Sequence, residues 1–250
     1  MLVGTLLLGG CGGAHGPVGP ALEETAANLA KVESGVLSLA VEVEPKNGGG
    51  YGYEIRGPVK LAPEGKLPLA DVTYTQRANG NEDRARLVLT EEGGWVERAG
   101  RRTDLDEQQL SQLRASGSLL GQGGLKDLRF QDWIVDPELS DGPAGTDKVT
   151  ASLDVVAAMN GLAGLAGLPG GTRPLEPADR DQLERAVEDS SFELLTGDED
   201  RLLRKLSLAV TFATDVPQDL RAALGKDAVG ARFSFDLELD KVNEPVAIGG

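Results

Sequence analysis

Apolar and polar side chains alternate with a period of two along much of this chain, the pattern of half-buried β-strands. The clearest cases are residues 205–213 and 231–241, near the carboxyl terminus. Their apolar positions are Leu206, Leu208, Val210, Phe212, Phe233, Phe235, Leu237 and Leu239. Strands with one apolar and one polar face pair in antiparallel sheets, and we expect these two to do so.

The same alternation predicts more strands, joined by short turns rich in Gly, Asn and Asp that are typical of hairpins. We expect them at residues 36–44, 51–56, 69–77, 84–90, 94–98, 125–133 and 147–155. Residues 136–145 are expected to form a polar loop. There is no break in composition after residue 21, so residues 21–250 are predicted to form a single domain.

Other segments repeat their apolar residues at helical spacing. Helices are expected at residues 21–33, 104–115, 177–189 and 217–224. Asp104 is predicted to cap the second helix, with Glu107 three residues later. These helices can cover only the apolar face of the sheet, which gives an α+β fold.

The segment 161–168 is unusual, because it repeats Gly, Leu and Ala without any charge. Each glycine costs a helix about 1 kcal/mol relative to alanine. One interpretation is a mobile apolar flap over a cavity. The other, which we favour, is a buried helix or a glycine-rich loop.

Composition limits the classes of function. The net charge of −15 disfavours binding to nucleic acid, and association with a membrane would need apolar insertion or a covalent anchor. Cys11 and His15 are the only cysteine and histidine, so no intrachain disulfide can form. Beyond this terminus the chain has no Cys or His, which the common zinc sites and Cys–His or Ser–His catalysis require. Acidic clusters such as 198–200 are expected to mark solvated turns. We therefore predict no enzyme and no cofactor.

The amino terminus resembles the export signal of a bacterial lipoprotein. The apolar run 2–8 is too short to span a bilayer, which needs about 20 residues, but it suits a signal peptide. The sequence Leu8-Gly9-Gly10-Cys11 that ends it resembles a lipobox. This resemblance implies cleavage before Cys11, acylation of that cysteine, and anchoring to the outer face of the cytoplasmic membrane.

We accordingly predict a signal peptide at residues 1–10 and a flexible tether at 11–20. No Lys or Arg precedes the apolar run. Either Met1 lies downstream of the true start or the export signal is weak. The alternative is that a cysteine follows an apolar amino terminus by chance.

Several segments together resemble the LppX/LprG-type lipoproteins, whose fold is similar to that of the LolA and LolB carriers. They are the tether, the helix that leads directly into the strand at 37–43, the stretch 196–206 with Leu202-Leu203-Arg204-Lys205-Leu206, and the closing Val242-Asn243-Glu244-Pro245-Val246. The resemblance implies a strongly curved half-barrel sheet whose concave apolar face is covered by helices. It also implies a cavity for acyl chains and the binding or carrying of a lipid or glycolipid.

Two hypotheses for function follow. In the first, the protein binds or carries an amphiphile, and the eight apolar residues of 205–213 and 231–241 contact the ligand, although core packing is the favoured role for any single one of them. In the second, the protein is a cell-envelope interaction or regulatory module with a filled core. It would bind a protein partner through acidic loops or through surfaces around Trp95 and Trp133. A cavity of several hundred Å³ would favour the first hypothesis.

Overall fold

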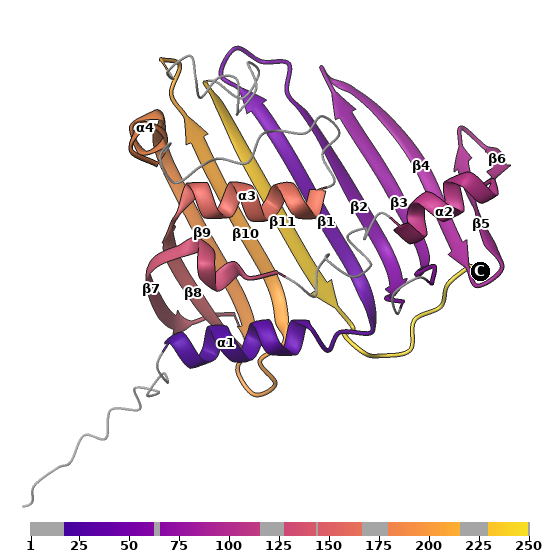
Figure 1. Ribbon diagram of the computed structural model, residues 1–250, viewed down its shortest axis with the longest axis horizontal. Helices are drawn as coiled ribbons and strands as arrows, with labels where there is room; N and C mark the ends of the chain where they lie inside the picture. Colours follow the sequence, from indigo (N-terminus) through magenta and orange to yellow (C-terminus); the bar gives the residue numbers. More distant parts are fainter. Residues whose placement is uncertain are drawn as a thin grey trace, which may run out of the picture.

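The computed structural model describes residues 18–62, 66–115, 128–143, 145–166, 180–215 and 230–249. Within these ranges, eleven strands form one sheet that is antiparallel throughout and does not close on itself (Figure 1). The predicted α+β class with a single half-barrel sheet is confirmed. The strands are β1 (Ser34–Pro45), β2 (Tyr51–Lys60), β3 (Leu69–Ala78), β4 (Asn81–Thr90), β5 (Gly93–Arg98), β6 (Arg101–Asp104), β7 (Ile134–Asp141), β8 (Thr146–Leu153), β9 (Val187–Gly197), β10 (Leu203–Phe212) and β11 (Ala231–Asp240).

The sheet consists of two meanders that meet at its centre. Strands β1 to β6 follow one another toward one edge, and β11 back to β7 follow one another toward the other edge. The two meanders are joined where β1 pairs with β11, for example at Leu39 with Leu237 and Val41 with Phe235. The middle of the sheet therefore forms between the first and the last strand of the domain.

Strand β1 shows why the two faces of the sheet differ. Its residues alternate between buried and half-buried from Ser34 to Val43, with Leu37 and Leu39 in the core. The intervening side chains point to the opposite face, which carries ion pairs between strands. There Arg77 on β3 contacts Glu54 on β2 at 3.0 Å. The predicted separation into an apolar and a polar face is confirmed.

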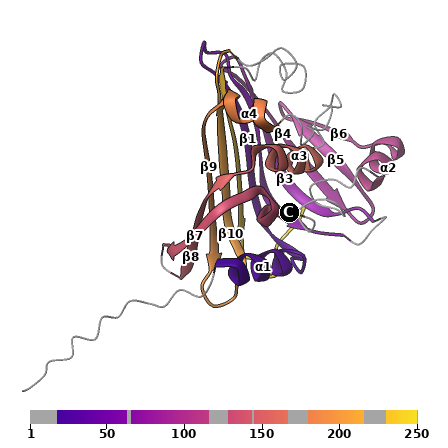
Figure 2. The same ribbon diagram turned by 60° about the vertical axis from the view of Figure 1, so that its left-hand side comes forward.

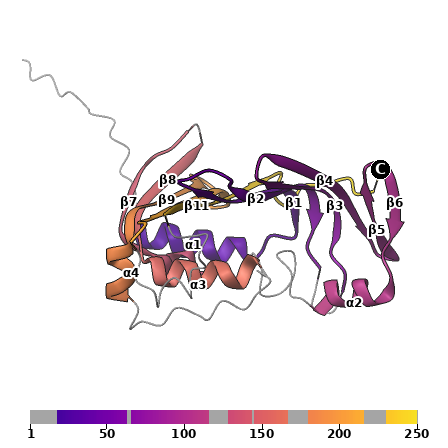
Figure 3. The ribbon, with the colours of Figure 1, turned by 90° about the horizontal axis from the view of Figure 1, so that it is seen from above.

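The described helices all lie on the apolar side of the sheet (Figures 2 and 3). Figure 3 shows three of them beneath the half of the sheet that contains β7 to β11, and α2 beneath the opposite edge near β5 and β6. A 3-10 helix, η2 (Phe130–Trp133), precedes β7. The α-helices are α1 (Val18–Leu29), α2 (Glu107–Ala115), α3 (Val155–Ala166) and α4 (Arg180–Ala186).

Helix α1 is anchored to the sheet by two buried hydroxyl groups. The Thr25 hydroxyl donates to the backbone oxygen of Ala21 at 2.7 Å and lies 2.8 Å from the Thr196 hydroxyl on β9. The helix begins at Val18, three residues before the expected start at 21. It ends before residue 33 because Val32 already belongs to a turn, in which its amide donates to the oxygen of Leu29.

Helix α2 starts later than expected, and a different residue caps it. Asp104 pairs with Trp95 in the sheet, so it cannot begin the helix. Instead, the Asp106 carboxylate accepts from the amide of Gln109 at 2.8 Å, and the Gln109 side chain accepts from the amide of Asp106 at 2.9 Å. This is a reciprocal capping box.

The prediction of a strand over residues 125–133 is wrong for the part that the structure describes. Phe130 and Trp133 are both buried and stand three residues apart, the spacing of one helical turn, and they belong to η2. Of residues 136–145, expected as a polar loop, residues 136–141 instead belong to β7. This edge strand has polar side chains and no clean alternation, and its register shifts between Val135 and Glu138.

The helix predicted at residues 177–189 is only partly correct. Leu183 and Ala186 are buried as expected, but the helix ends at Ala186, and Val187 opens β9 opposite Phe212. Strands β6 and β9 were not predicted. The helix expected at 217–224, Cys11 and residues 177–179 lie outside the described residues.

The repeat of Gly, Leu and Ala begins inside a buried helix, as favoured from the sequence. Helix α3 buries Val156, Ala158 and Leu162. Its Gly161 meets the ring of Trp133, and a Cβ placed on this glycine would lie 2.5 Å from the ring. Glycine is therefore needed at 161 for the close approach of helix and indole.

Candidate functional site

The eight residues predicted to contact a ligand lie together on the apolar faces of β10 and β11. Seven of them are at most 2% exposed, and Phe233 is half-buried. Register places several of them directly opposite one another: Leu206 and Leu237, Leu208 and Phe235, Val210 and Phe233. The sequence therefore identified one continuous apolar surface correctly.

This surface is covered by side chains of the helices. The core cluster that contains these eight residues, with Phe233 at its margin, also includes Leu22 of α1, Leu162 of α3, Leu183 of α4 and Trp133 of η2. In the part of the chain that the structure describes, β10 and β11 thus face a packed interior. Their side chains act there as core residues.

A cavity of about 480 Å³ lies elsewhere, at the edge of the sheet where β2 ends and β3 begins. Its volume is within the range of about 300–1,000 Å³ that is usual for small-molecule sites. None of the eight predicted residues lines it. The lining residues are Lys60, Leu61, Ala62, Lys66, Leu67, Leu69, Glu91 and Arg114.

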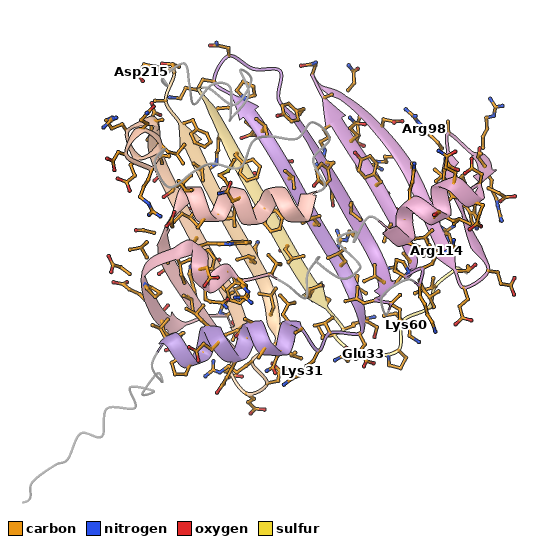
Figure 4. All side chains as sticks on the ribbon, viewed as in Figure 1. Lys31, Glu33, Lys60, Arg98, Arg114 and Asp215 are labelled. Atoms are coloured by element: carbon orange, nitrogen blue, oxygen red, sulfur yellow. The ribbon has the colours of Figure 1, made fainter. Side chains whose placement is uncertain are left out.

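Three elements position these lining residues. Lys60 closes β2 opposite Leu69, the first residue of β3. The amide of Leu61 donates to the oxygen of Glu33 at 2.7 Å, which fixes the strand end to the start of β1. Arg114 comes from the last turn of α2 (Figure 4), a helix seated by its buried Leu110. The cavity therefore depends on how α2 docks beside the strand ends.

The cavity combines apolar walls with several charges. Lys60, Lys66 and Glu91 are exposed, whereas Arg114 is half-buried and forms an ion pair with Glu107 at 2.6 Å. Within the described residues, Lys60 and Lys66 form no ion pair. The walls can accept apolar groups, and the rim can bind anionic groups.

Beyond the cavity, the apolar face of β2, β3 and β4 is only partly covered. Register places Ile55 opposite both Leu39 and Tyr74, and Tyr53 opposite Val41, so these side chains share the apolar face. Tyr53, Ile55 and Tyr74 are nonetheless half-buried. This contrasts with the tight packing on β10 and β11.

Aromatic residues mark the far end of this face. Tyr53 and Tyr74 stack with ring centroids 6.0 Å apart. Burial raises the pKa of the Tyr53 hydroxyl, and the neighbouring Tyr74 raises it further. Tyr51, two residues before Tyr53, is 50% exposed. The apolar face therefore runs along β2 from exposed Tyr51 to buried Val59, next to the cavity.

The two tryptophans occupy different environments. Trp133 is a core residue, so it does not offer the exposed surface that the second hypothesis would use. Trp95 is half-buried on the polar face, with the guanidinium groups of Arg86 and Arg102 at 5.3 and 4.5 Å from its ring centre. These cation–π contacts stabilise the edge formed by β4, β5 and β6.

The acidic side chains bear on metal binding, and the lengths of the helices bear on membrane spanning. Among the described residues, no three or more His, Cys, Asp or Glu side chains gather where they could hold a metal ion. The Asp200 carboxylate in the acidic turn accepts hydrogen bonds from the amide of Leu202 and from Arg204. None of the helices in the described ranges is both long and apolar enough to cross a bilayer.

An open antiparallel half-barrel with its helices on one face is the architecture that the sequence resemblance implied. The solved structure of LprF from Mycobacterium bovis has this fold as well: it matches 92% of this chain and 95% of its own, with a TM-score of 0.51 and 14% sequence identity. At this identity the match establishes the fold alone. The resemblance in fold to an LppX/LprG-type protein is thus confirmed.

Two further solved structures match less well. MucB in complex with MucA(peri) covers 92% of this chain and 57% of its own at 14% identity, with a TM-score of 0.29. A LolA superfamily protein from Nitrosomonas europaea covers 93% and 96% at 11% identity, with a TM-score of 0.23. No family model matches the sequence. No curated protein matches it either.

Proposed function

We propose that this protein binds or carries an amphiphile, with the acyl chains of the ligand lying between the sheet and its helices. The observation that carries the proposal is the cavity of about 480 Å³ at the end of β2. It adjoins the half of the sheet whose apolar face is least covered. The proposed function is non-enzymatic and needs no cofactor.

The driving force for binding is burial of apolar surface, at about 25 cal/mol per Å². The half-buried side chains of Tyr53, Ile55 and Leu87 supply such surface on β2 and β4. Acyl chains laid against them remove both partners from water. The polar headgroup remains at the rim, where Lys60 and Lys66 are exposed.

The eight apolar residues of β10 and β11 take a supporting role in this proposal. Seven of them hold the packed half of the sheet against its helices, which gives the open half a rigid wall. Phe233 is the candidate for direct contact, because it is half-buried and pairs with Val43 on β1 and Val210 on β10. The ligand would reach Phe233 across β1.

We also propose that the chain is exported and anchored by lipid on Cys11 to the outer face of the cytoplasmic membrane. The lipobox-like Leu8-Gly9-Gly10-Cys11 supports this, together with the single cysteine of the chain. Residues 1–10 would be the signal peptide and a tether would follow Cys11. The single domain would then begin with α1, whose first residue is Val18. The tether would hold the domain near its membrane.

The packed half of the interior favours a second candidate function, an envelope interaction or regulatory module without a ligand. Leu206, Leu237 and their neighbours are buried in one core cluster with residues of α1, α3 and α4 in the described part of the chain. A module of this kind would bind a protein partner and take up no lipid. Uptake of lipid therefore separates the two candidates.

The test is titration of the full chain with a fluorescent fatty acid. Replacing Ala62, which lines the cavity, by Phe should fill the site and weaken uptake at least about tenfold, because the new ring occupies the volume needed by the ligand. Ala247→Phe is the matched control, since Ala247 is exposed in the carboxyl-terminal segment. Equal uptake by both variants, or no uptake by the unaltered chain, would contradict the proposal.

A further inference from the structure

Three of the four charged residues that line the cavity at the end of β2 are basic, although the whole chain carries a net charge of −15. Lys60, Lys66 and Arg114 line it, and Glu91 is the one acidic residue among its lining groups. In a chain with 40 acidic and 25 basic residues, a random surface pocket would have the opposite balance. The local charge thus distinguishes this site from the rest of the surface.

Basic residues on the polar face of the sheet are used differently. Arg77 contacts Glu54 at 3.0 Å, and Lys205 contacts Glu238 at 3.1 Å. Those cations are neutralised by neighbouring strands. Lys60 and Lys66 have no such acidic partner among the described residues, so both ammonium groups are available to an anion. Charge-assisted hydrogen bonds to phosphate or carboxylate are about twice as strong as neutral ones.

The cavity also lies at one end of the apolar face described above. Strand β2 has ten residues, from Tyr51 to Lys60, which corresponds to about 30 Å of strand. One leaflet of a bilayer core is about 15 Å thick, so acyl chains of membrane lipids fit along this length. Side chains alternate along β2, so Lys60 points away from Val59, and its ammonium group would reach the headgroup around the end of the strand, where Lys60 lines the cavity.

We propose that Lys60 and Lys66 bind the anionic headgroup of an amphiphile, through its phosphate or carboxylate, beside Arg114, which also pairs with Glu107, while the acyl chains lie along the apolar face of β2 and β3. This inference rests on the amphiphile binding proposed above and adds the class of headgroup. Glu91 opposes the anion and limits its affinity.

The experiment compares two fluorescent lipids with the same acyl chains, phosphatidylglycerol and a neutral diacylglycerol, on the full chain at low salt. The unaltered protein should bind the anionic lipid about tenfold more tightly. The double variant Lys60→Gln/Lys66→Gln should lose this preference and keep its affinity for the neutral lipid. The control Lys46→Gln/Lys148→Gln changes the net charge equally, at the opposite end of β1 and on β8, and should retain the preference.

A variant that removes a negative charge from the cavity, instead of a positive one, adds a second test. Glu91→Gln removes the carboxylate from the lining, so it should tighten binding of phosphatidylglycerol about twofold to threefold. Glycerol phosphate alone should compete weakly, because it lacks the acyl chains that supply most of the affinity.

Three results would overturn the inference. Equal affinity for both lipids, unchanged in the lysine variant, would refute the headgroup class and leave amphiphile binding intact. Competition by glycerol phosphate at the concentration of the lipid itself would indicate a site for a free anion. Binding of neither lipid would refute the headgroup proposal and the proposed function together.

Discussion

The indole ring of Trp133 packs directly on the backbone of Gly161, so that the 3-10 helix η2 and helix α3 approach more closely than any other residue at 161 would permit. A Cβ at 161 would lie within 2.6 Å of three atoms of the ring. Both elements belong to the layer that covers the packed half of the sheet. This contact explains a glycine that helix propensity alone disfavours.

Gly161→Ala should therefore destabilise the protein by about 1–3 kcal/mol, because the clash outweighs the gain of about 1 kcal/mol in helix propensity. Gly19→Ala is the matched control in α1, where nothing lies within 4 Å of the new methyl group. It should be neutral or stabilising by up to about 1 kcal/mol. Urea unfolding measures both changes, and equal effects at the two sites would contradict the packing described.

The hydroxyl pair of Thr25 and Thr196 should be energetically coupled. Both side chains are fully buried, and the Thr25 hydroxyl already donates to Ala21, so Thr196 donates either to Thr25 or to the oxygen of Leu202. Each Thr→Val change should cost about 1–2 kcal/mol. The double variant should cost about 1 kcal/mol less than their sum, as measured in a double-mutant cycle. Strict additivity would show that the two hydroxyls do not interact.

The ion pair of Asp71 and Arg86 makes stability depend on pH. The Arg86 side chain donates to both Asp71 oxygens, at 2.7 and 2.6 Å. These hydrogen bonds and the positive charge, together with the amide of Gly249, hold the pKa of the Asp71 carboxyl below its ordinary value of 3.8. The ion pair therefore contributes its full stabilisation of the folded state at pH values above 3.8, the ordinary pKa. This contribution is lost as the pH falls through the lowered pKa of Asp71.

We expect Asp71→Asn to cost about 1 kcal/mol at pH 7. Its difference from the unaltered protein should shrink toward zero below about pH 4. Asp83→Asn is the control, because the pair of Asp83 with Arg98 is much more exposed and should contribute only about 0.3 kcal/mol. Denaturant unfolding between pH 7 and acid pH checks this. If the free energy of unfolding of Asp71→Asn differed from that of the unaltered protein by the same amount down to the lowest pH, the result would be inconsistent with the ion pair.

Cys11→Ser should release the protein from membranes. A serine cannot form the thioether that links diacylglycerol to the anchor, and two or three acyl chains contribute about 0.8 kcal/mol per buried CH₂. Fractionation of host cells followed by immunoblotting measures the change, with His15→Ser as a control that leaves the cysteine in place. Unchanged sedimentation of Cys11→Ser with membranes would argue against the lipobox.

The central strand β1 was predictable because its burial alternates without interruption. In β1, every second residue from Gly35 to Val43 is buried, and that periodicity is visible in the sequence itself. The edge strands show no such alternation of buried and exposed residues. All four residues of β6 are exposed, and β7 has no regular alternation. Edge strands are defined by a neighbour on one side only, which local periodicity does not encode.

The candidate site was predictable only in part. The apolar surface of β10 and β11 was identified, but the sequence could not distinguish a packed face from an open one. That distinction depends on which helices lie above each strand. Lys60, Lys66 and Arg114 meet only because α2 docks beside the end of β2, so their proximity is a tertiary property. Two lysines six residues apart in an acidic chain, Lys60 and Lys66, were the one local sign.

The central claim is that the interior beside β2 holds an amphiphile, and native mass spectrometry of the full chain purified from its own host tests it most directly. We predict about one non-covalently bound lipid per chain, released on activation and largely absent from Ala62→Phe. A chain that is lipid-free in every preparation, and that takes up no lipid when offered it, would contradict the account.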